Sequence, residues 1–213
     1  MQKQEELRVR IRRATKIVTV LKKLYPRAGV FLNFRTPWEL LVAVILSAQC
    51  TDKKVNEVTA TLFKKYKTFN AYCTADIREF ENAIHPTGFY KTKAKHILQT
   101  AKIIKEQYMG RVPRTMEELL TLYGVGRKTG NIILESVYGI VVGIPVDTHV
   151  RRLARVWGLS KESNPNKIER DLMELIPKKN WAGLSYRIVA YGREYCPAKK
   201  HNHAVCPISK ITV

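Results

Sequence analysis

Two residues of opposite charge, Lys128 and Asp147, stand where each could take part in a reaction. Lys128 follows a glycine turn, Gly124-Val125-Gly126, and lies in the first turn of a predicted helix. There the positive end of the helix dipole opposes an ammonium charge and favours the neutral amine, which can attack an electrophilic carbon. Most lysines of a basic chain are solvated surface charges, so Lys128 alone does not decide the matter.

Asp147 begins the next predicted helix, and its plainest interpretation is an N-cap that accepts a hydrogen bond from the helix backbone. Capping leaves the carboxylate able to take a proton or to stabilise positive charge that develops during a reaction. Sequence spacing does not establish that Lys128 and Asp147 meet, so the pair is a hypothesis.

The glycine turn is also a candidate phosphate site. Gly124 and Gly126 have no side chains at the point where one helix ends and the next begins, so backbone amides can approach an anion. On the glycines alone, a plain turn closed by a glycine C-cap is an equal alternative. The charge favours the phosphate site, because 38 Lys and Arg against 18 Asp and Glu give a net charge of +20.

So basic a chain predicts a polyanionic partner. Its basic residues are spread over the whole length, without a basic amphipathic segment that carries a bulky aromatic face, so nucleic acid is favoured over a membrane surface. Residues 1–13 lack the apolar core of a signal peptide, and the apolar run 40–46 is too short to span a bilayer. We expect a protein of the bacterial or archaeal cytoplasm with reduced cysteines.

The elements that position these residues are predicted to be helices, so the fold class is all-α. Periodic apolar residues predict helices over 5–24, 37–48, 52–66, 91–108, 127–138 and 147–157, and a short one that starts after Thr115. Thr36 and Thr115 begin capping boxes, while Asp52 and Thr74 are candidate caps. Residues 139–146 read as a loop or one short strand.

Four motifs occur in order along the chain: Leu46-Ser47-Ala48-Gln49 with Thr51-Asp52, Gly88-Phe89-Tyr90, Gly124-Val125-Gly126-Arg127-Lys128-Thr129, and Val146-Asp147-Thr148-His149-Val150. Taken together, they resemble the endonuclease III type DNA glycosylases of the helix-hairpin-helix superfamily. The resemblance covers nearly the full length in the right order, and it is most specific between Tyr123 and Arg152.

The resemblance implies a two-lobed helical fold with a DNA-binding cleft between the lobes. One lobe is a six-helix barrel over 30–141 that contains the helix-hairpin-helix at about 116–139. The second lobe combines 1–29 with 142–213. Since one chain supplies both lobes, we expect a monomer.

The implied activity is that of a bifunctional base excision repair enzyme, a DNA glycosylase and AP lyase on double-stranded DNA with damaged bases or abasic sites. An oxidised pyrimidine is flipped out of the duplex. Lys128 attacks the C1′ atom of that nucleotide, expels the base and forms a Schiff base with the opened sugar. β-Elimination then breaks the strand 3′ to the lesion, and Asp147 is the carboxylate partner.

The resemblance also assigns residues that contact DNA. Gln49 matches the wedge that fills the gap left by the flipped base, and Phe89 matches an apolar side chain inserted in the opposite strand. Without the resemblance, these two would read as a helix-end amide and a half-buried aromatic. The other assigned residues are Tyr90, Gly124, Val125, Gly126, Arg127, Thr129 and His149.

The carboxy-terminal segment departs from the family. Many relatives carry four cysteines there that hold an iron-sulfur cluster, and this chain has Cys196, His203, Cys206 and Thr212 at those places. Threonine is not a cluster ligand, and two thiolates with one imidazole are too few soft donors for four irons. We therefore predict no iron-sulfur cluster and no cofactor.

Zinc is the alternative for this segment, since two thiolates and two imidazoles form a legitimate structural site. The weak candidate ligands are Cys196, His201, His203 and Cys206, but their spacing matches no common zinc module. The favoured interpretation is a vestigial loop held by packing, whose Lys199, Lys200 and Lys210 contact DNA phosphates.

A second departure is Tyr123, where relatives usually have proline, and it bears on substrate range more than on the reaction. Two rival functions remain open. One is a monofunctional glycosylase for mismatched or alkylated bases in which Asp147 activates water, and the other is a non-catalytic DNA-binding protein.

Overall fold

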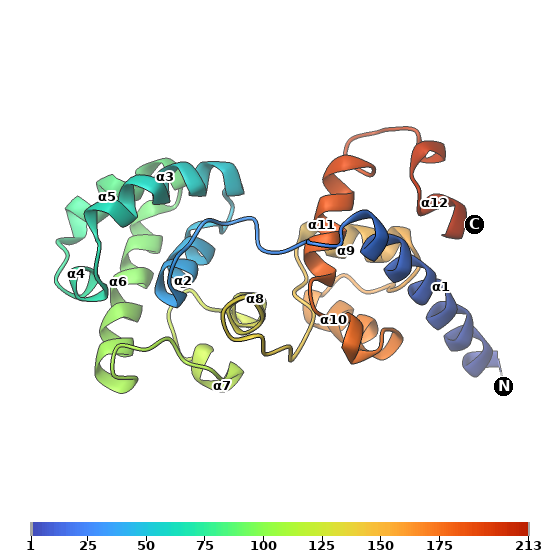
Figure 1. The fold of residues 1–213 in the computed structure, drawn as a ribbon, viewed down its shortest axis with the longest axis horizontal. Helices are drawn as coiled ribbons and strands as arrows, with labels where there is room; N and C mark the ends of the chain where they lie inside the picture. Colours follow the sequence, from blue (N-terminus) through green and yellow to red (C-terminus); the bar gives the residue numbers. More distant parts are fainter. Residues whose placement is uncertain (1, 213) are drawn as a thin grey trace. The chain divides into compact units, whose positions relative to one another are not determined.

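The computed structural model describes residues 2–212, with side chains described for 4–209 and 211. Lys210, assigned above to phosphate contact, and Thr212, at the fourth ligand place, thus have side chains outside the described residues. Helices and loops make up everything that is described, without a strand, so the all-α prediction is confirmed (Figure 1). The α-helices are α1 (Gln2–Leu24), α2 (Pro37–Leu46), α3 (Asp52–Lys65), α4 (Phe69–Cys73), α5 (Ile77–Ile84), α6 (Tyr90–Gln107), α7 (Met116–Leu119), α8 (Arg127–Tyr138), α9 (Thr148–Val156), α10 (Pro165–Leu175), α11 (Leu184–Glu194) and α12 (Ser209–Thr212), and the 3-10 helices are η1 (His85–Thr87), η2 (Lys178–Asn180) and η3 (His203–Val205).

Local capping explains where most helices begin. Thr36 accepts a hydrogen bond from the amide of Glu39 at 3.1 Å, and Thr115 accepts one from the amide of Glu118 at 3.3 Å, as the two capping boxes predict. The candidate cap Asp52 was wrong by one position. Thr51 caps α3, because it has the extended backbone that a cap requires and Asp52 is already helical.

The candidate cap Thr74 is also wrong. It ends α4 with φ −112° and ψ 4°, a backbone from which the following helix does not start. Asp76 caps α5 instead and accepts from the amide of Glu79 at 2.9 Å. The short helix α4, which Thr68 caps, was missed because its apolar pattern is too brief to show a period.

The chain divides into two compact units: unit 1 is Met1–Val30 with Val141–Val213, and unit 2 is Phe31–Ile140. The roles of barrel and second lobe stay predictions. In unit 2, α2 is almost entirely buried and packs against α3, α6 and α8. An aromatic cluster fills the rest of its interior, with ring centroids 5.1 to 5.9 Å apart among Trp38, Tyr66, Phe69, Tyr72 and Phe80.

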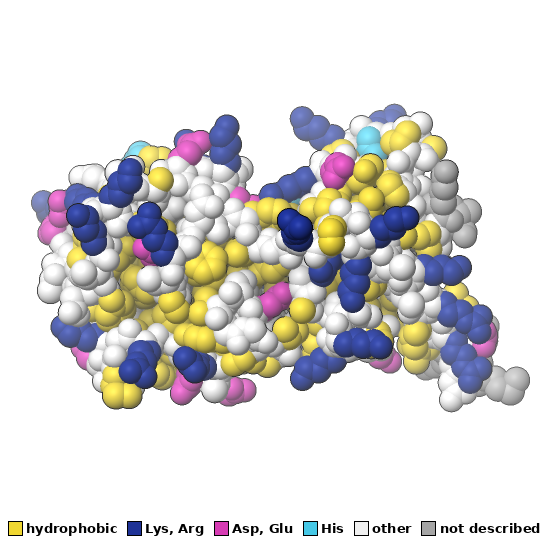
Figure 2. Space-filling model, in the orientation of Figure 1, with side chains coloured by type: hydrophobic (Ala, Val, Ile, Leu, Met, Phe, Trp, Pro, Cys, Tyr) yellow, Lys and Arg dark blue, Asp and Glu magenta, His cyan; other side chains and the backbone are white. Residues whose placement is uncertain are grey.

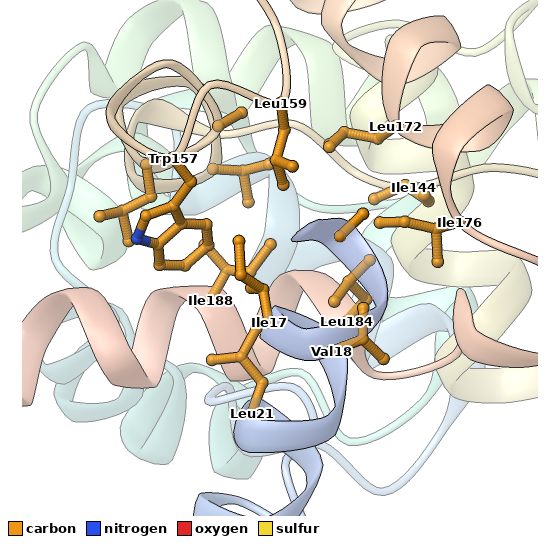
Figure 3. Close-up of a cluster of buried hydrophobic side chains, with 14 of the residues drawn as sticks. Ile17, Val18, Leu21, Ile144, Trp157, Leu159, Leu172, Ile176, Leu184 and Ile188 are labelled. Atoms are coloured by element: carbon orange, nitrogen blue, oxygen red, sulfur yellow. The ribbon is translucent and has the colours of Figure 1, made fainter. Parts of the chain in front are cut away.

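Unit 1 is built on α1, which packs against α10, α11 and α12. Its buried face presents Ile17, Val18 and Leu21 to a cluster that also contains Trp157 and Ile188 (Figure 3). Burial of this apolar surface joins the two ends of the chain into one core. No helix in the described part of the chain is long and apolar enough to cross a bilayer.

Candidate functional site

Lys128 lies in the first turn of α8, as predicted, and its side chain is exposed. In the described part of unit 2, its ammonium group has no hydrogen bond or ion pair. An amine at a helix N-terminus, free of carboxylate partners within its own unit, is available to react with a carbon that is brought to it.

The turn before α8 has two glycines with different environments. Gly124 has φ +73°, and a Cβ there would lie 3.0 Å from Nδ1 of His96, so the turn fits tightly against α6. Gly126 has an extended backbone, and a Cβ there would meet nothing within 4 Å. No side chain caps the helix, so the first amides of α8 face open space at Gly126.

His96 supports this turn and was not identified from the sequence. Its ring stacks on that of Tyr123, with centroids 6.2 Å apart and an interplanar angle of 24°. The carbonyl of Tyr123 also accepts a hydrogen bond from Thr100 of α6 at 3.1 Å. The residue that replaces the family's proline therefore anchors the turn to α6 by its backbone and lies against His96 by its ring.

Asp147 caps α9, as predicted, and its Oδ1 accepts a hydrogen bond from the amide of Val150 at 2.8 Å. The cap uses one carboxylate oxygen, and a carboxylate has a second one for other work. His149 is half-buried, and a Cβ at Gly192 of α11 would approach its Nδ1 to 2.8 Å. Lys128 belongs to unit 2 and Asp147 to unit 1, so their joint action stays a prediction.

Gln49 and Phe89 share an unusual backbone. Both have positive φ, 52° and 49°, in the left-handed region that costs free energy for a residue with a Cβ atom. Both side chains are exposed, Phe89 at 66%, although it was expected to be half-buried if it had no role on DNA. Met109 of the same unit also has positive φ and is exposed, so what sets Gln49 and Phe89 apart is their place in the motifs assigned to DNA contact.

The neighbours of these residues are ordered by packing. The helix before Gln49 ends at Leu46, two residues earlier than predicted, because Ser47 turns its hydroxyl back onto the carbonyl of Val44 at 2.8 Å. Tyr90 is half-buried, and its ring lies 4.5 Å from that of His85. Arg127 and Thr129 are also partly covered in the first turn of α8, while Val125 is buried.

Lys93 is a second residue that the sequence did not reveal. Its side chain is 4% exposed, and its ammonium donates to the carbonyls of Leu46 and Thr87, both at 2.8 Å. Burial lowers the pKa of Lys93. The five lysines on α6 look alike in sequence, and only the three-dimensional packing distinguishes the buried one.

The carboxy-terminal loop brings four metal-binding side chains together. The donor atoms of Cys196, His201, His203 and Cys206 all lie within 4.8 Å of one another, so this group could hold a metal ion. The same residues do not fit a four-iron cluster, which takes four thiolates around a cube of iron and sulfide. Two thiolates and two imidazoles instead surround a space of single-ion size.

A positively charged hollow on unit 1 was also missed. It has a volume of about 860 Å³ and is lined by Arg151, Arg152 and Arg155 of α9, with His149 and Ala198. The spacing of the three arginines on one helix would have been the signal. Lys and Arg predominate among the charged side chains on the face that Figure 2 shows.

Comparison with known proteins adds independent findings. Residues 42–178 match the HhH-GPD superfamily of base excision DNA repair proteins. The chain is 49% identical to endonuclease III of Synechocystis sp. over 93% of its own length and 91% of the relative's. It also resembles two solved structures.

The first is a non-covalent endonuclease III-DNA complex, with TM-score 0.90 and 36% identity over 95% of this chain and 94% of the other. The second is a trapped covalent endonuclease III-DNA intermediate, with TM-score 0.87 and 37% identity over 93% and 94%.

Proposed function

The chain belongs to the endonuclease III family of the HhH-GPD superfamily, and we propose that Lys128 is its nucleophile and Asp147 its catalytic carboxylate. It is a base excision repair DNA glycosylase with AP lyase activity. The observation that supports the assignment of Lys128 is an exposed amine in the first turn of α8, directly after an uncapped glycine turn.

In the proposed reaction, Asp147 accepts the proton that the Lys128 nitrogen loses as it bonds to the sugar, and passes that proton to the departing base. The nitrogen attacks C1′ of the damaged nucleotide, a C–N bond forms, and the bond from C1′ to the base breaks as the base leaves with a proton. The sugar ring opens to a Schiff base. Loss of a proton from C2′ then expels the 3′ phosphate by β-elimination, and water releases the lysine.

We propose that the groups that bind DNA do so without recognising its base sequence. The first amides of α8, reached past Gly126, bind a phosphate, and Arg127 and Thr129 extend the contact. Phosphate binding of this kind suits an enzyme that has to search any DNA for lesions. Gln49 and Phe89 occupy the duplex where the damaged nucleotide leaves it, and Tyr90 and His149 complete the contact.

We propose oxidised pyrimidines as the substrates and a monomer as the active form. The activity would take place on chromosomal DNA in the bacterial or archaeal cytoplasm. No step needs a metal, because lysine supplies the nucleophile and the carboxylate handles the proton. We also propose that the loop of Cys196 and Cys206 carries no iron-sulfur cluster, since its donor set is wrong for one.

Borohydride trapping tests this proposal. The full chain is mixed with a duplex that carries one thymine glycol, and borohydride reduces the Schiff base to a stable covalent complex. We expect the wild type to be trapped, and we expect Lys128→Gln to lose trapping and strand cleavage by at least about 1000-fold while DNA binding stays within a few fold.

Lys102→Gln is the matched control, since Lys102 is an exposed lysine on α6 of the same unit. It removes the same charge and should leave trapping unchanged. Trapping that persists in Lys128→Gln would move the nucleophile to another residue.

A further inference from the structure

The Cys and His side chains of the carboxy-terminal loop have the dimensions of a single-ion site. Sγ of Cys206 lies 3.5 Å from Nε2 of His201 and 4.0 Å from Nδ1 of His203. Sγ of Cys196 lies 4.0 Å from the same Nδ1 of His203. Both sulfur atoms are buried, since Cys196 and Cys206 are each 2% exposed.

These distances can be compared with those around tetrahedral zinc. Bonds of about 2.3 Å to sulfur and about 2.0 Å to nitrogen place neighbouring ligands roughly 3.3 to 3.8 Å apart. The group in this chain spans up to 4.8 Å, so side-chain shifts of about an ångström bring all four donors onto one ion.

Hydrogen bonds already orient two of the ligands. Nδ1 of His201 lies 2.9 Å from the carbonyl of Lys199, and it can contact that oxygen only as an N–H donor. The proton is therefore on Nδ1, and the lone pair on Nε2 points to the sulfur of Cys206. Arg152 donates a hydrogen bond to the sulfur of Cys196 at 3.6 Å, which helps to hold that side chain in place.

We propose that Cys196, His201, His203 and Cys206 bind one structural zinc ion. Two thiolates balance the charge of Zn²⁺, and the donor set matches a closed site without an open position for catalysis. The ion would fasten the loop after α11 to the core of unit 1, which contains Cys196, Cys206 and Ile208. It would also fix Lys199 and Lys200, both exposed, on a rigid loop.

Metal analysis of the untagged full chain tests this proposal without any measurement of activity. We expect about one zinc per chain in the wild type and less than about 0.2 in Cys206→Ser and His201→Ala. Cys73→Ser is the matched control, because Cys73 belongs to unit 2 and is not part of the group, and this variant should retain the ion.

Cobalt titration of the wild type stripped of metal gives a second readout that does not depend on variants that fold. We expect the visible bands of tetrahedral cobalt with thiolate charge transfer, displaced by zinc. Iron with sulfide in an anaerobic preparation would overturn the proposal. So would a wild type that contains no zinc and binds no cobalt.

A different observation, the buried Lys93, carries a second inference. Its two acceptor carbonyls, at Leu46 and Thr87, belong to the two segments that lead into Gln49 and Phe89. One ammonium group therefore joins both segments, each of which ends in a residue with positive φ. Without such a tie, the strained backbone would relax to more favourable conformations.

We infer that Lys93 is a positioning residue that keeps Gln49 and Phe89 ready to enter the duplex. The inference rests on the proposed function, because it takes the DNA roles of these two residues from it. Loss of the ammonium should impair opening of paired DNA and spare the later chemistry.

Single-turnover excision by Lys93→Met tests this, with thymine glycol placed either in a paired duplex or in a bubble of unpaired bases. We expect a fall of at least about 10-fold on the duplex and less than about 3-fold in the bubble, with Lys93→Arg partly restoring duplex activity. An equal fall in the excision rate on both substrates would show that Lys93 has only a structural role. Absence of excision by the wild type on either substrate would instead refute the proposed function.

Discussion

The helices α8 and α9 both carry a proposed catalytic residue at their start, but they begin in opposite ways. Gly126 begins α8 without a side-chain cap, and its missing Cβ leaves open space. Asp147 begins α9 and satisfies the amide of Val150 itself. The first helix thus leaves its amides to an external anion, whereas the second satisfies an amide internally and presents a charged group.

This difference separates two tasks that a helix start can perform. A helix start without a side-chain cap leaves amides that a bound phosphate can satisfy. In the protein without DNA, the same unsatisfied amides lower the stability. A capped start holds a carboxylate in a fixed orientation. Substitutions that exchange these properties test whether the contrast is functional.

Among the substitutions that exchange these properties, Asp147→Asn should have the largest effect. Asparagine is as good an N-cap as aspartate, so the midpoint of thermal unfolding should stay within about 2 °C. The charge is lost, and single-turnover base release should fall by at least about 100-fold. Asp147→Ala, which removes cap and charge together, should in addition lose about 1 kcal/mol of unfolding free energy. Near-normal base release by Asp147→Asn would remove Asp147 from the chemistry.

An intermediate effect is expected for Gly126→Ser, which makes the start of α8 resemble that of α9. The extended backbone at Gly126 accepts serine, whose hydroxyl can cap the helix and stabilise the protein by a few tenths of a kcal/mol. The same hydroxyl occupies the phosphate position, so the dissociation constant for duplex DNA should rise by about 10-fold.

Gly130→Ala is the comparison for this variant, because a Cβ there would meet the sulfur of Met116 at 2.6 Å. It should cost about 1 to 3 kcal/mol of stability through overpacking, with DNA binding by the folded protein nearly unchanged. Binding of the duplex that is as tight in Gly126→Ser as in the wild type would show that α8 does not hold a phosphate.

The smallest effect should come from Arg155→Gln in the arginine-lined hollow beside α9. If this hollow receives a phosphate, the slope of log binding constant against log salt should decrease by about one unit. Lys178→Gln, an exposed charge elsewhere in unit 1, should change the slope by less. An unchanged slope in Arg155→Gln would restrict phosphate contact to other surfaces.

Much of the fold was predictable, because helix starts are encoded locally. Thr36, Thr115 and Asp147 each accept a bond from an amide three residues ahead, so sequence alone locates them. The choice between Thr51 and Asp52 depends on which backbone is extended, and neighbouring polar residues give no information on that. The existence of a helix is therefore easier to predict than the residue at which it begins.

The residues of the candidate site also divide into those that the sequence predicts and those that only the structure reveals. Lys128 and Gly126 could be identified because the motif is contiguous. Lys93 could not, since its role depends on two carbonyls brought close by the packing of α2, η1 and α6. The four metal-binding side chains were only weak zinc candidates, because their spacing is atypical and their convergence comes from the fold of the loop.

The discontinuity of unit 1 has a consequence for its assembly during synthesis. Unit 2 is one continuous segment and can fold as soon as it leaves the ribosome. The apolar face of α1 must wait for α11, and the hydrogen bond from Arg187 to the carbonyl of Tyr25 closes a separation of 162 positions. Throughout that interval Ile17, Val18 and Leu21 lack their final partners. The nascent chain thus presents an amphipathic helix that chaperones can recognise before the repair enzyme is complete.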